Sequence, residues 1–290
     1  MDVYIQIIAL YKKRGYHIAG GEFPWHFDTL YPMEMLRNYR SFPFMSITKG
    51  KHSFSVGGGI SPLELILLVA VIRAMKPKRI FIIGNAFGWS TLALGLADPQ
   101  TQVLAIDSIE EGSDAAQGFT LTQEIIKEEG LENITLVQAR SPEDVSHIVK
   151  THFDGPIDLA LIDGLHTNQQ QYLDFCALQT VMAKTQMIFL HDVLNWELTA
   201  SYRKIRKEFS HLQSNILMRT PSGMGVFYSS DVPQAAQDIL NGFTEEASII
   251  RQKHQVLKNR ITQFMAETKI KLTRKVFPKR KMSAVIVERL

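Results

Sequence analysis

The sequence predicts a doubly wound α/β fold, in which helices cover both faces of a mostly parallel sheet. The first indication is a series of short apolar runs typical of buried strands, near residues 79–84, 102–107, 133–138, 157–162 and 186–191. Helical segments alternate with these runs, near residues 89–97, 117–129, 168–183 and 196–209. The second indication is a Pro-Ser-Gly turn between two further runs, 216–219 and 224–228, which predicts that the sheet ends in an antiparallel pair.

Composition limits the classes to which the protein can belong. The chain has 290 residues, of which 45% are hydrophobic, enough for a substantial core in one large domain or two small ones. Cys176 is the only cysteine, which excludes an intrachain disulfide and favours a reducing compartment. The N-terminus lacks the pattern of a signal peptide, and the longest apolar run, Leu65 to Ile72, is too short to span a bilayer. We therefore expect a cytoplasmic protein without a transmembrane helix.

Residues 1–60 are expected to form a cap segment, because they do not share the alternating pattern that follows. An amphipathic helix around Val3 to Arg14 precedes irregular chain in which aromatic residues and prolines alternate, as in Phe23 to Phe27. These aromatic side chains would pack either at the mouth of the next domain or on its core. Ser55 to Ile60 contains three consecutive glycines and is expected to be a hinge or loop. The main domain is expected over residues 61–230, with Ser61 capping its first helix.

Residues 231–290 are expected to form a long helix and a basic tail. The helical pattern runs from Pro233 to about Leu272, and such a length requires a packing partner. We favour a homo-oligomer through residues 233–272 over packing on the same subunit. Residues 269–281 carry seven basic and no acidic side chains, whereas the rest of the chain has a net charge of −4. The tail is either a solvated extension or a contact for an anionic surface or substrate.

A glycine turn after the first strand predicts the ligand-binding edge of the sheet. Gly84 and Gly88 allow a sharp turn and close approach of a ligand, and the helix that follows offers free amide donors. We expect cofactor contacts from the turn and the start of the helix, namely Gly84, Asn85, Ala86, Gly88, Trp89 and Ser90. Asp107 ends the second strand, where a carboxylate can accept two ribose hydroxyls or can cap the next segment.

Acidic residues and histidines follow the fourth and fifth strands. Asp163 and Asp192 should lie close together, because neighbouring strands are about 5 Å apart. They could share a divalent cation, which would be Mg²⁺ or Ca²⁺ with oxygen ligands alone, or Mn²⁺, iron or Zn²⁺ if His166 or His191 contributed. Equally, both could serve only to bond loop amides and cap a helix. His166 is the first candidate for a general base.

These segments resemble the class I S-adenosylmethionine-dependent methyltransferases, and among them the small-molecule O-methyltransferases that include the macrocin and catechol enzymes. The most specific part is Asp158-Leu159-Ala160-Leu161-Ile162-Asp163-Gly164-Leu165-His166, which is similar to the family's "D-L-x-x-I-D-G-x-H" signature. Ile83 to Thr91 resembles the family's cofactor loop, and Arg219 to Gly225 resembles its closing hairpin. The resemblance covers about residues 60–230.

The resemblance implies a seven-stranded Rossmann-like sheet whose last strand is antiparallel. It would place the methionine part of the cofactor over Gly84 to Gly88, the ribose at Asp107, Ser108 beside it, and the adenine near Arg140 and Ser141. Asp163 and Asp192 match the first two metal-ligand positions, whereas the third position is Val193, with Asn195 two residues further on. Two other positions depart from the family pattern: Ile82 replaces an acidic residue and Ala86 replaces a glycine.

The implied activity is transfer of a methyl group from S-adenosylmethionine to a hydroxyl of a small-molecule, sugar or lipid-linked acceptor, with Mg²⁺ or another divalent cation as a second cofactor. His166, Asp163 and Asp192 would carry the catalysis. Two alternatives remain at this stage. One is a non-catalytic binding or scaffold protein that retains the fold. The other is an NAD-dependent oxidoreductase, which the Gly84 to Gly88 spacing disfavours because it lacks the Gly-x-Gly-x-x-Gly pattern.

Overall fold

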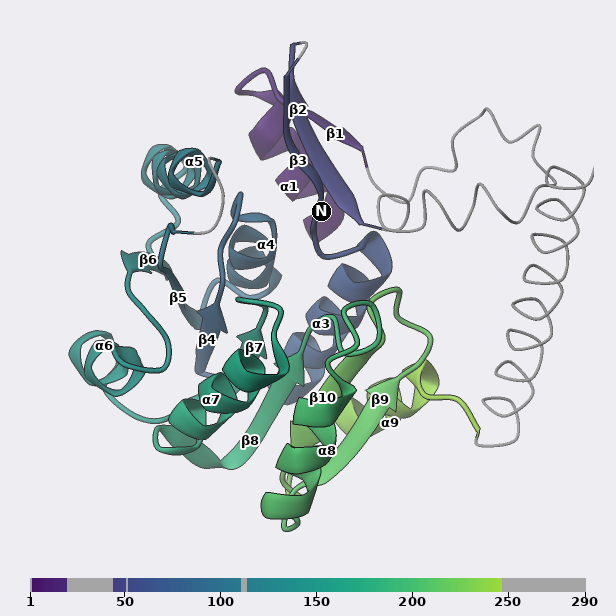
Figure 1. Cartoon of the computed structure of the whole chain (residues 1–290). Helices are drawn as coiled ribbons and strands as arrows, with labels where there is room; N and C mark the ends of the chain where they lie inside the picture. The colour runs from purple at the N-terminus through teal and green to yellow at the C-terminus, as the bar shows by residue number, and fades with distance from the viewer. Residues whose placement is uncertain (1, 20–43, 51, 111–113, 247–290) are drawn as a thin grey trace, which may run out of the picture. The chain divides into compact units, whose positions relative to one another are not determined.

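The computed structural model describes residues 2–19, 44–50, 52–110 and 114–246 (Figure 1). Met1–Thr244 forms one compact unit, and Glu245–Leu290 forms a second, of which only the first two residues are described. The aromatic segment around Phe23 to Phe27, the expected helix over 247–272 and the basic tail all lie outside the described residues. The expected oligomer contact and the role of the tail therefore stay predictions, as do the expected domain boundaries.

The centre of the first unit is a seven-stranded sheet in the order β6-β5-β4-β7-β8-β10-β9. Its strands are β4 (Arg79–Ile83), β5 (Gln102–Asp107), β6 (Ile134–Gln138), β7 (Ile157–Ile162), β8 (Met182–Leu190), β9 (Gln213–Leu217) and β10 (Met224–Tyr228). The five strands from β6 to β8 are parallel, and β10 is antiparallel to both β8 and β9. The expected seven-stranded, mostly parallel sheet with an antiparallel end is confirmed.

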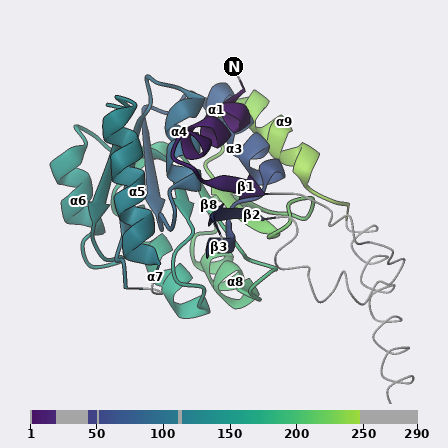
Figure 2. The same ribbon diagram turned by 90° about the horizontal axis from the view of Figure 1, so that it is seen from above.

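Helices cover both faces of this sheet. Successive residues of a strand point to opposite faces, so one strand can pack against the helices of both. Ile80 and Ile82 of β4 pack in a core with the helices of one face, whereas Phe81 and Ile83 pack in a second core. The first face is covered by α3 (Pro62–Met75), α4 (Trp89–Ala97), α5 (Ala115–Glu128) and α9 (Gln234–Phe243). The second is covered by α6 (Val145–His152), α7 (Asn168–Gln179) and α8 (Thr199–Glu208), and Figure 2 shows α3 and α9 on one side of the sheet with α7 and α8 on the other.

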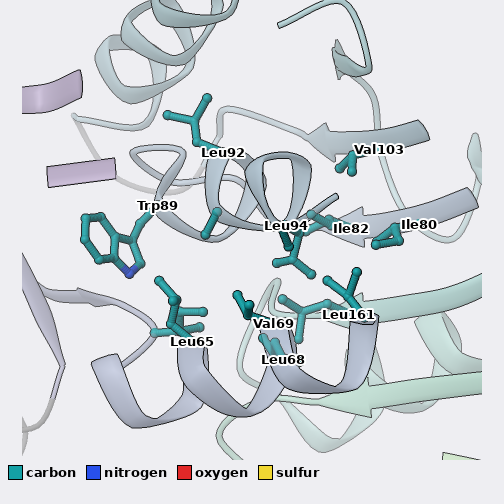
Figure 3. Close-up of a cluster of buried hydrophobic side chains, with 14 of the residues drawn as sticks. Leu65, Leu68, Val69, Ile80, Ile82, Trp89, Leu92, Leu94, Val103 and Leu161 are labelled. Carbon is teal, nitrogen blue, oxygen red and sulfur yellow. The ribbon is translucent and has the colours of Figure 1, made fainter. Parts of the chain in front are cut away.

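Helix α3 begins with a complete capping box. Ser61 Oγ accepts a hydrogen bond from the Glu64 amide at 3.1 Å, and Glu64 Oε2 accepts one from the Ser61 amide at 2.8 Å. The apolar face of the helix then packs on the sheet and on α4; Figure 3 shows Leu65, Leu68 and Val69 in the core that also holds Ile82 and Leu161. The predicted Ser61 cap is confirmed.

The N-terminal segment contains a second, three-stranded antiparallel sheet of β1 (His17–Ala19), β2 (Met45–Lys49) and β3 (His52–Gly59). The expected loop or hinge over Ser55 to Ile60 is therefore wrong as far as Gly59, because this glycine-rich run pairs with β2. Gly59 pairs with Met45, and a Cβ atom at Gly59 would lie 3.2 Å from that of Met45. Glycine here permits close approach of two backbones, which local propensity alone does not reveal.

Helix α1 (Val3–Lys12) confirms the predicted amphipathic N-terminal helix and packs on the domain. Its buried Tyr11 donates a hydrogen bond to the Phe87 carbonyl, and the Tyr11 ring lies 6.0 Å from that of Trp89. Arg14, just after the helix, pairs with Glu128 and Glu129 at the end of α5. The N-terminal segment is thus attached directly to the turn before α4.

Helix α9 ends at Phe243, because Thr244 is extended with a ψ of 165°. The prediction of one continuous helix from 233 is therefore wrong at this point. Ala236 and Leu240 of α9 pack into the core that includes α3. Among the helices that the structure describes, none has the length and apolar character needed to cross a membrane.

Candidate active site

The loops that follow β4, β5, β6 and β7 line one cavity of about 550 Å³ at the carboxyl edge of the sheet. Most of the residues predicted to bind a cofactor line it: Gly84, Asn85, Ala86, Trp89, Ser90, Asp107, Ser108, Arg140, Ser141 and Asp163. His166 lines it as well, whereas Gly88, Asp192 and Asn195 do not. The sequence therefore places the cavity correctly at the strand ends, where parallel sheets bind ligands.

The turn after β4 requires glycine at two positions. Gly84 has a φ of +96°, and a Cβ atom there would lie 2.0 Å from the Asp163 carbonyl oxygen. Gly88 has a φ of +81°, and a Cβ atom there would lie 2.2 Å from Thr122 Oγ1. The turn is thus held between the loop after β7 and helix α5, with no room for a side chain at either glycine.

Asp107 binds the backbone of the same turn. Its Oδ2 accepts hydrogen bonds from the amides of Asn85 at 2.8 Å and Ala86 at 3.1 Å, and its Oδ1 accepts one from Ile109 at 2.7 Å. A carboxylate held by three amides keeps its orientation. Asp107 is therefore fixed at the cavity wall and couples the first two strand ends.

The side chain of Asn85 is used inside the turn. Its Oδ1 accepts from Thr91 Oγ1 at 2.9 Å, and its Nδ2 donates to the Ala86 carbonyl at 3.0 Å and to Thr122 Oγ1 at 3.2 Å. The residue is 3% exposed. Asn85 thus shapes the cavity from behind and offers it little polar surface.

Arg140 and Ser141 lie at the opposite wall of the cavity. Arg140 forms an ion pair with Glu110, and this pairing raises the pKa of the guanidinium. Ser141 Oγ donates to Asp174 Oδ1 at 2.5 Å, and Gln170 Nε2 donates to the same oxygen at 2.8 Å. Buried Asp174 of α7 therefore holds the loop after β6 in place.

Four side chains from β7, β8 and their loops converge beside the cavity: Asp163, His166, His191 and Asp192, whose nearest ligand atoms all lie within 4.8 Å of one another. His166 Nε2 is 2.9 Å from Asp192 Oδ2, and His191 Nδ1 is 3.0 Å from Asp163 Oδ1 and 3.2 Å from Asp192 Oδ2. The predicted proximity of the two carboxylates is confirmed, and both histidines join them.

The charged groups of this cluster shift one another's pKa values. Burial by itself would raise the pKa of Asp163 and Asp192, but the facing histidine His191 lowers both. Burial would lower the pKa of His166, but Asp163 and Asp192 raise it to about 9. The pKa of His191 is raised well above its usual value by the carboxylates, against the effect of burial. With no cation bound, the two carboxylates therefore favour the protonated form of His166.

The donor geometry of the cluster fits a cation. His166 Nε2 and His191 Nδ1 are buried and make no hydrogen bond, although carboxylate oxygens lie at ion-pair distance from both. Two ring nitrogens and two carboxylates therefore face one another without hydrogen-bond geometry. Such a set of nitrogen and oxygen atoms suits a divalent metal ion.

Comparison with known proteins agrees with this arrangement. Residues 81–193, which run from β4 to the residue after Asp192, match a family model described as a methyltransferase domain. This part is less than half of the chain, and over it the protein is similar to a methyltransferase domain. No curated protein matches the sequence.

Two solved structures share the fold of this chain. A protein from Klebsiella pneumoniae, provisionally assigned as an O-methyltransferase, is 13% identical with a TM-score of 0.50, covering 79% of this chain and 90% of its own. A protein from Staphylococcus aureus, provisionally assigned as a caffeoyl-CoA O-methyltransferase, is 15% identical with a TM-score of 0.50, covering 59% of this chain and 85% of its own. At these identities the similarity shows the fold alone.

Asn195 lies next to the cluster of carboxylates and histidines. Its Nδ2 donates to Asp192 Oδ1 at 3.0 Å, so it orients that carboxylate with its amide nitrogen. Its role as a third oxygen ligand stays a prediction. Asp192 has a positive φ of 58°, a conformation that aspartate tolerates better than most residues.

Sequence reasoning missed three residues around the cluster. Glu64 is fully buried in α3, and its Oε2 lies 3.3 Å from His191 Nε2. Trp196 stacks on His166 with ring centroids 5.0 Å apart, and Phe44 meets His191 edge-on at 6.1 Å. Only Glu64 carried a usable signal, since an acidic residue within an apolar helix face is rarely left buried without a partner.

Proposed function

We propose that the protein transfers a methyl group from S-adenosylmethionine to a hydroxyl of a small-molecule acceptor. The observation that carries the proposal is the shared cavity: the glycine turn after β4, Asp107 and the cluster with Asp163 and His166 all meet at one strand edge of a methyltransferase domain. S-adenosylmethionine supplies the reactive methyl group, so the protein has to bind it, align the acceptor and deal with the acceptor's proton.

The turn and Asp107 supply the cofactor side of the cavity. The backbone of Gly84 to Ala86 is fixed by Asp107 and by the loop after β7, which gives a preorganised surface for the amino acid part of the cofactor. The Asp107 carboxylate already uses both oxygens on amides, and each oxygen can accept a further hydrogen bond from a ribose hydroxyl. Ser108, Arg140 and Ser141 would contact the rest of the nucleoside.

Asp163, Asp192 and the two facing histidines would hold a divalent cation. A cation there would polarise the acceptor hydroxyl and make its proton easier to remove. It would also compete with protons for His166, because a metal ligand must be unprotonated. A neutral His166 bound to the cation through Nε2 would have no free lone pair, so its role as a base is the alternative to the cation. On that alternative route His166, at 33% side-chain exposure the most accessible member of the cluster, is the candidate to receive the acceptor proton.

The acceptor is a hydroxyl compound whose finer identity, small molecule, sugar or lipid-linked, we leave to experiment. Extracted metabolites would be incubated with the full-length protein and S-adenosylmethionine labelled in its methyl group. The proposal expects label in an organic product, released as methyl iodide when the methyl ether is cleaved with hydriodic acid. Label on nitrogen or carbon would contradict the O-methyltransferase proposal, and no transfer from any extract would favour the scaffold alternative.

The lone cysteine supports our prediction of a cytoplasmic location.

A further inference from the structure

Glu64 is a buried carboxylate that the proposed chemistry does not use. It is fully buried at the first turn of α3. Its Oε1 accepts hydrogen bonds from the Ser222 amide at 2.9 Å and the Ser222 hydroxyl at 2.5 Å, and its Oε2 accepts one from the Ser61 amide at 2.8 Å. The carboxylate is thus fixed by the start of α3 and by the turn between β9 and β10, independently of any ligand.

This fixed carboxylate determines how His191 is protonated. Glu64 Oε2 lies 3.3 Å from His191 Nε2, and an ionised carboxylate can only accept a hydrogen bond. Nε2 therefore carries a hydrogen, and in a neutral ring Nδ1 presents its lone pair to Asp163 and Asp192. A carboxylate that holds the far nitrogen of a metal-binding histidine fixes the tautomer and the orientation of the ring.

The other nitrogen of His191 is directed at the cluster without a hydrogen bond. His191 is 5% exposed, and its Nδ1 lies 3.0 Å from Asp163 Oδ1 and 3.2 Å from Asp192 Oδ2. Nδ1 makes no hydrogen bond with either oxygen. A lone pair among carboxylates is stabilised instead by a cation placed between them.

We propose that Glu64 is the positioning residue of a two-histidine, two-carboxylate centre that prefers a first-row transition-metal dication to Mg²⁺ or Ca²⁺. The ligands are Asp163, His166, His191 and Asp192, and Glu64 directs His191 Nδ1 toward them. Nitrogen ligands favour Mn²⁺, Fe²⁺, Co²⁺ and Zn²⁺, whereas Mg²⁺ and Ca²⁺ favour oxygen alone. The inference rests on the proposed cation site but not on methyl transfer.

Metal binding to the stripped full-length protein tests the preference. Mn²⁺ would be titrated by electron paramagnetic resonance, with Mg²⁺ and Ca²⁺ as competitors. We expect Mn²⁺ to bind at least about tenfold more tightly than either competitor. Pulsed measurements on the Mn²⁺-loaded protein should show nitrogen couplings from two bound imidazoles, and His191→Ala should leave one. Equal affinity for Mg²⁺, or bound Mn²⁺ without imidazole coupling, would overturn the proposal.

Glu64→Gln tests the positioning role at nearly constant volume. The glutamine carbonyl keeps the Ser222 contacts, so its amide group faces His191 and favours the tautomer with the proton on Nδ1. The same amide group can no longer accept the hydrogen bond from the Ser61 amide, so folding of the variant is checked first. Mn²⁺ affinity should fall about 10–100-fold, the usual effect of losing such a partner. Unchanged affinity in a folded variant would contradict the positioning role. If the variant does not fold, the imidazole couplings of the wild type still decide the ligand set.

Asp158→Asn is the matched control, because Asp158 lies at the opposite end of β7 and accepts amide hydrogen bonds from Lys78 and Arg79, both at 2.9 Å. It should leave Mn²⁺ affinity unchanged, and a loss equal to that of Glu64→Gln would show a nonspecific effect and refute the inference.

Calorimetry with S-adenosylhomocysteine on the same samples separates the two proposals. Mn²⁺ bound through two imidazoles without S-adenosylhomocysteine binding would refute the proposed function alone, and the reverse would refute the centre alone.

Discussion

Ala86→Gly should stabilise the protein, although glycine usually weakens a folded chain. Ala86 has a φ of +44°, where a residue with a Cβ atom is strained by about 1–2 kcal/mol. Glycine removes that strain but costs about 0.4–1 kcal/mol through the greater freedom of the unfolded chain. The Ala86 methyl group is exposed, so little packing is lost. The midpoints of these two ranges leave a net gain of about 0.8 kcal/mol in the free energy of unfolding.

Thermal and denaturant unfolding would measure this gain. For a unit of this size, about 1 kcal/mol corresponds to roughly 2–4 °C in melting temperature, so Ala86→Gly should melt about 1–4 °C higher. Ala116→Gly is a matched control, because Ala116 is equally exposed but lies in helix α5. That variant should lose up to about 1 kcal/mol. Destabilisation of both variants by the same amount would refute the argument that the turn is strained at Ala86.

Three further predictions concern the site and its supports. His166→Ala should reduce transfer of labelled methyl to the acceptor at least tenfold, since a positioned acid or base contributes about 10²–10⁴-fold to a rate. Binding of S-adenosylhomocysteine, measured by calorimetry, should change little. Unchanged turnover would remove His166 from the mechanism. In the metal-free protein, the stability that His166 contributes should be complete below its unfolded pKa of about 6.5 and should be lost as the pH rises through about 9. Urea unfolding midpoints measured across this pH range should therefore fall in the wild type and change less in His166→Gln. Tyr11→Phe should lower the free energy of unfolding by about 1–3 kcal/mol, because the Phe87 carbonyl loses its buried donor; an unchanged urea midpoint would show that the contact is not needed.

Much of the central fold follows from local sequence. The run Ile80 to Ile83 is apolar because both faces of β4 are covered, and Gly84 and Gly88 follow because side chains at these points would meet Asp163 and Thr122. The apolar run and the turn glycines are local signals that can be recognised without the structure, whereas the contacts with Asp163 and Thr122 cannot. The same holds for the convergence of Asp163 with the end of β8, which follows from parallel strand pairing.

The parts that were missed depend on distant contacts. β3 is a strand only because β2 pairs with its glycines, and α9 ends at Phe243 although an apolar helical pattern continues beyond it. Glu64 reaches His191 across 127 positions of sequence, so its partner could not be found by spacing. The raised pKa of His166 depends likewise on the side-chain positions of Asp163 and Asp192.

Calorimetric titration of the full-length protein with S-adenosylhomocysteine, and separately with NAD, tests the central claim most directly. The account predicts that one S-adenosylhomocysteine binds per chain and that NAD does not bind. It also predicts that Gly84→Ala abolishes binding of S-adenosylhomocysteine, because the new Cβ atom would lie 2.0 Å from the Asp163 carbonyl oxygen. Binding of NAD in its place, or of neither ligand, would contradict the assignment of this cavity to S-adenosylmethionine.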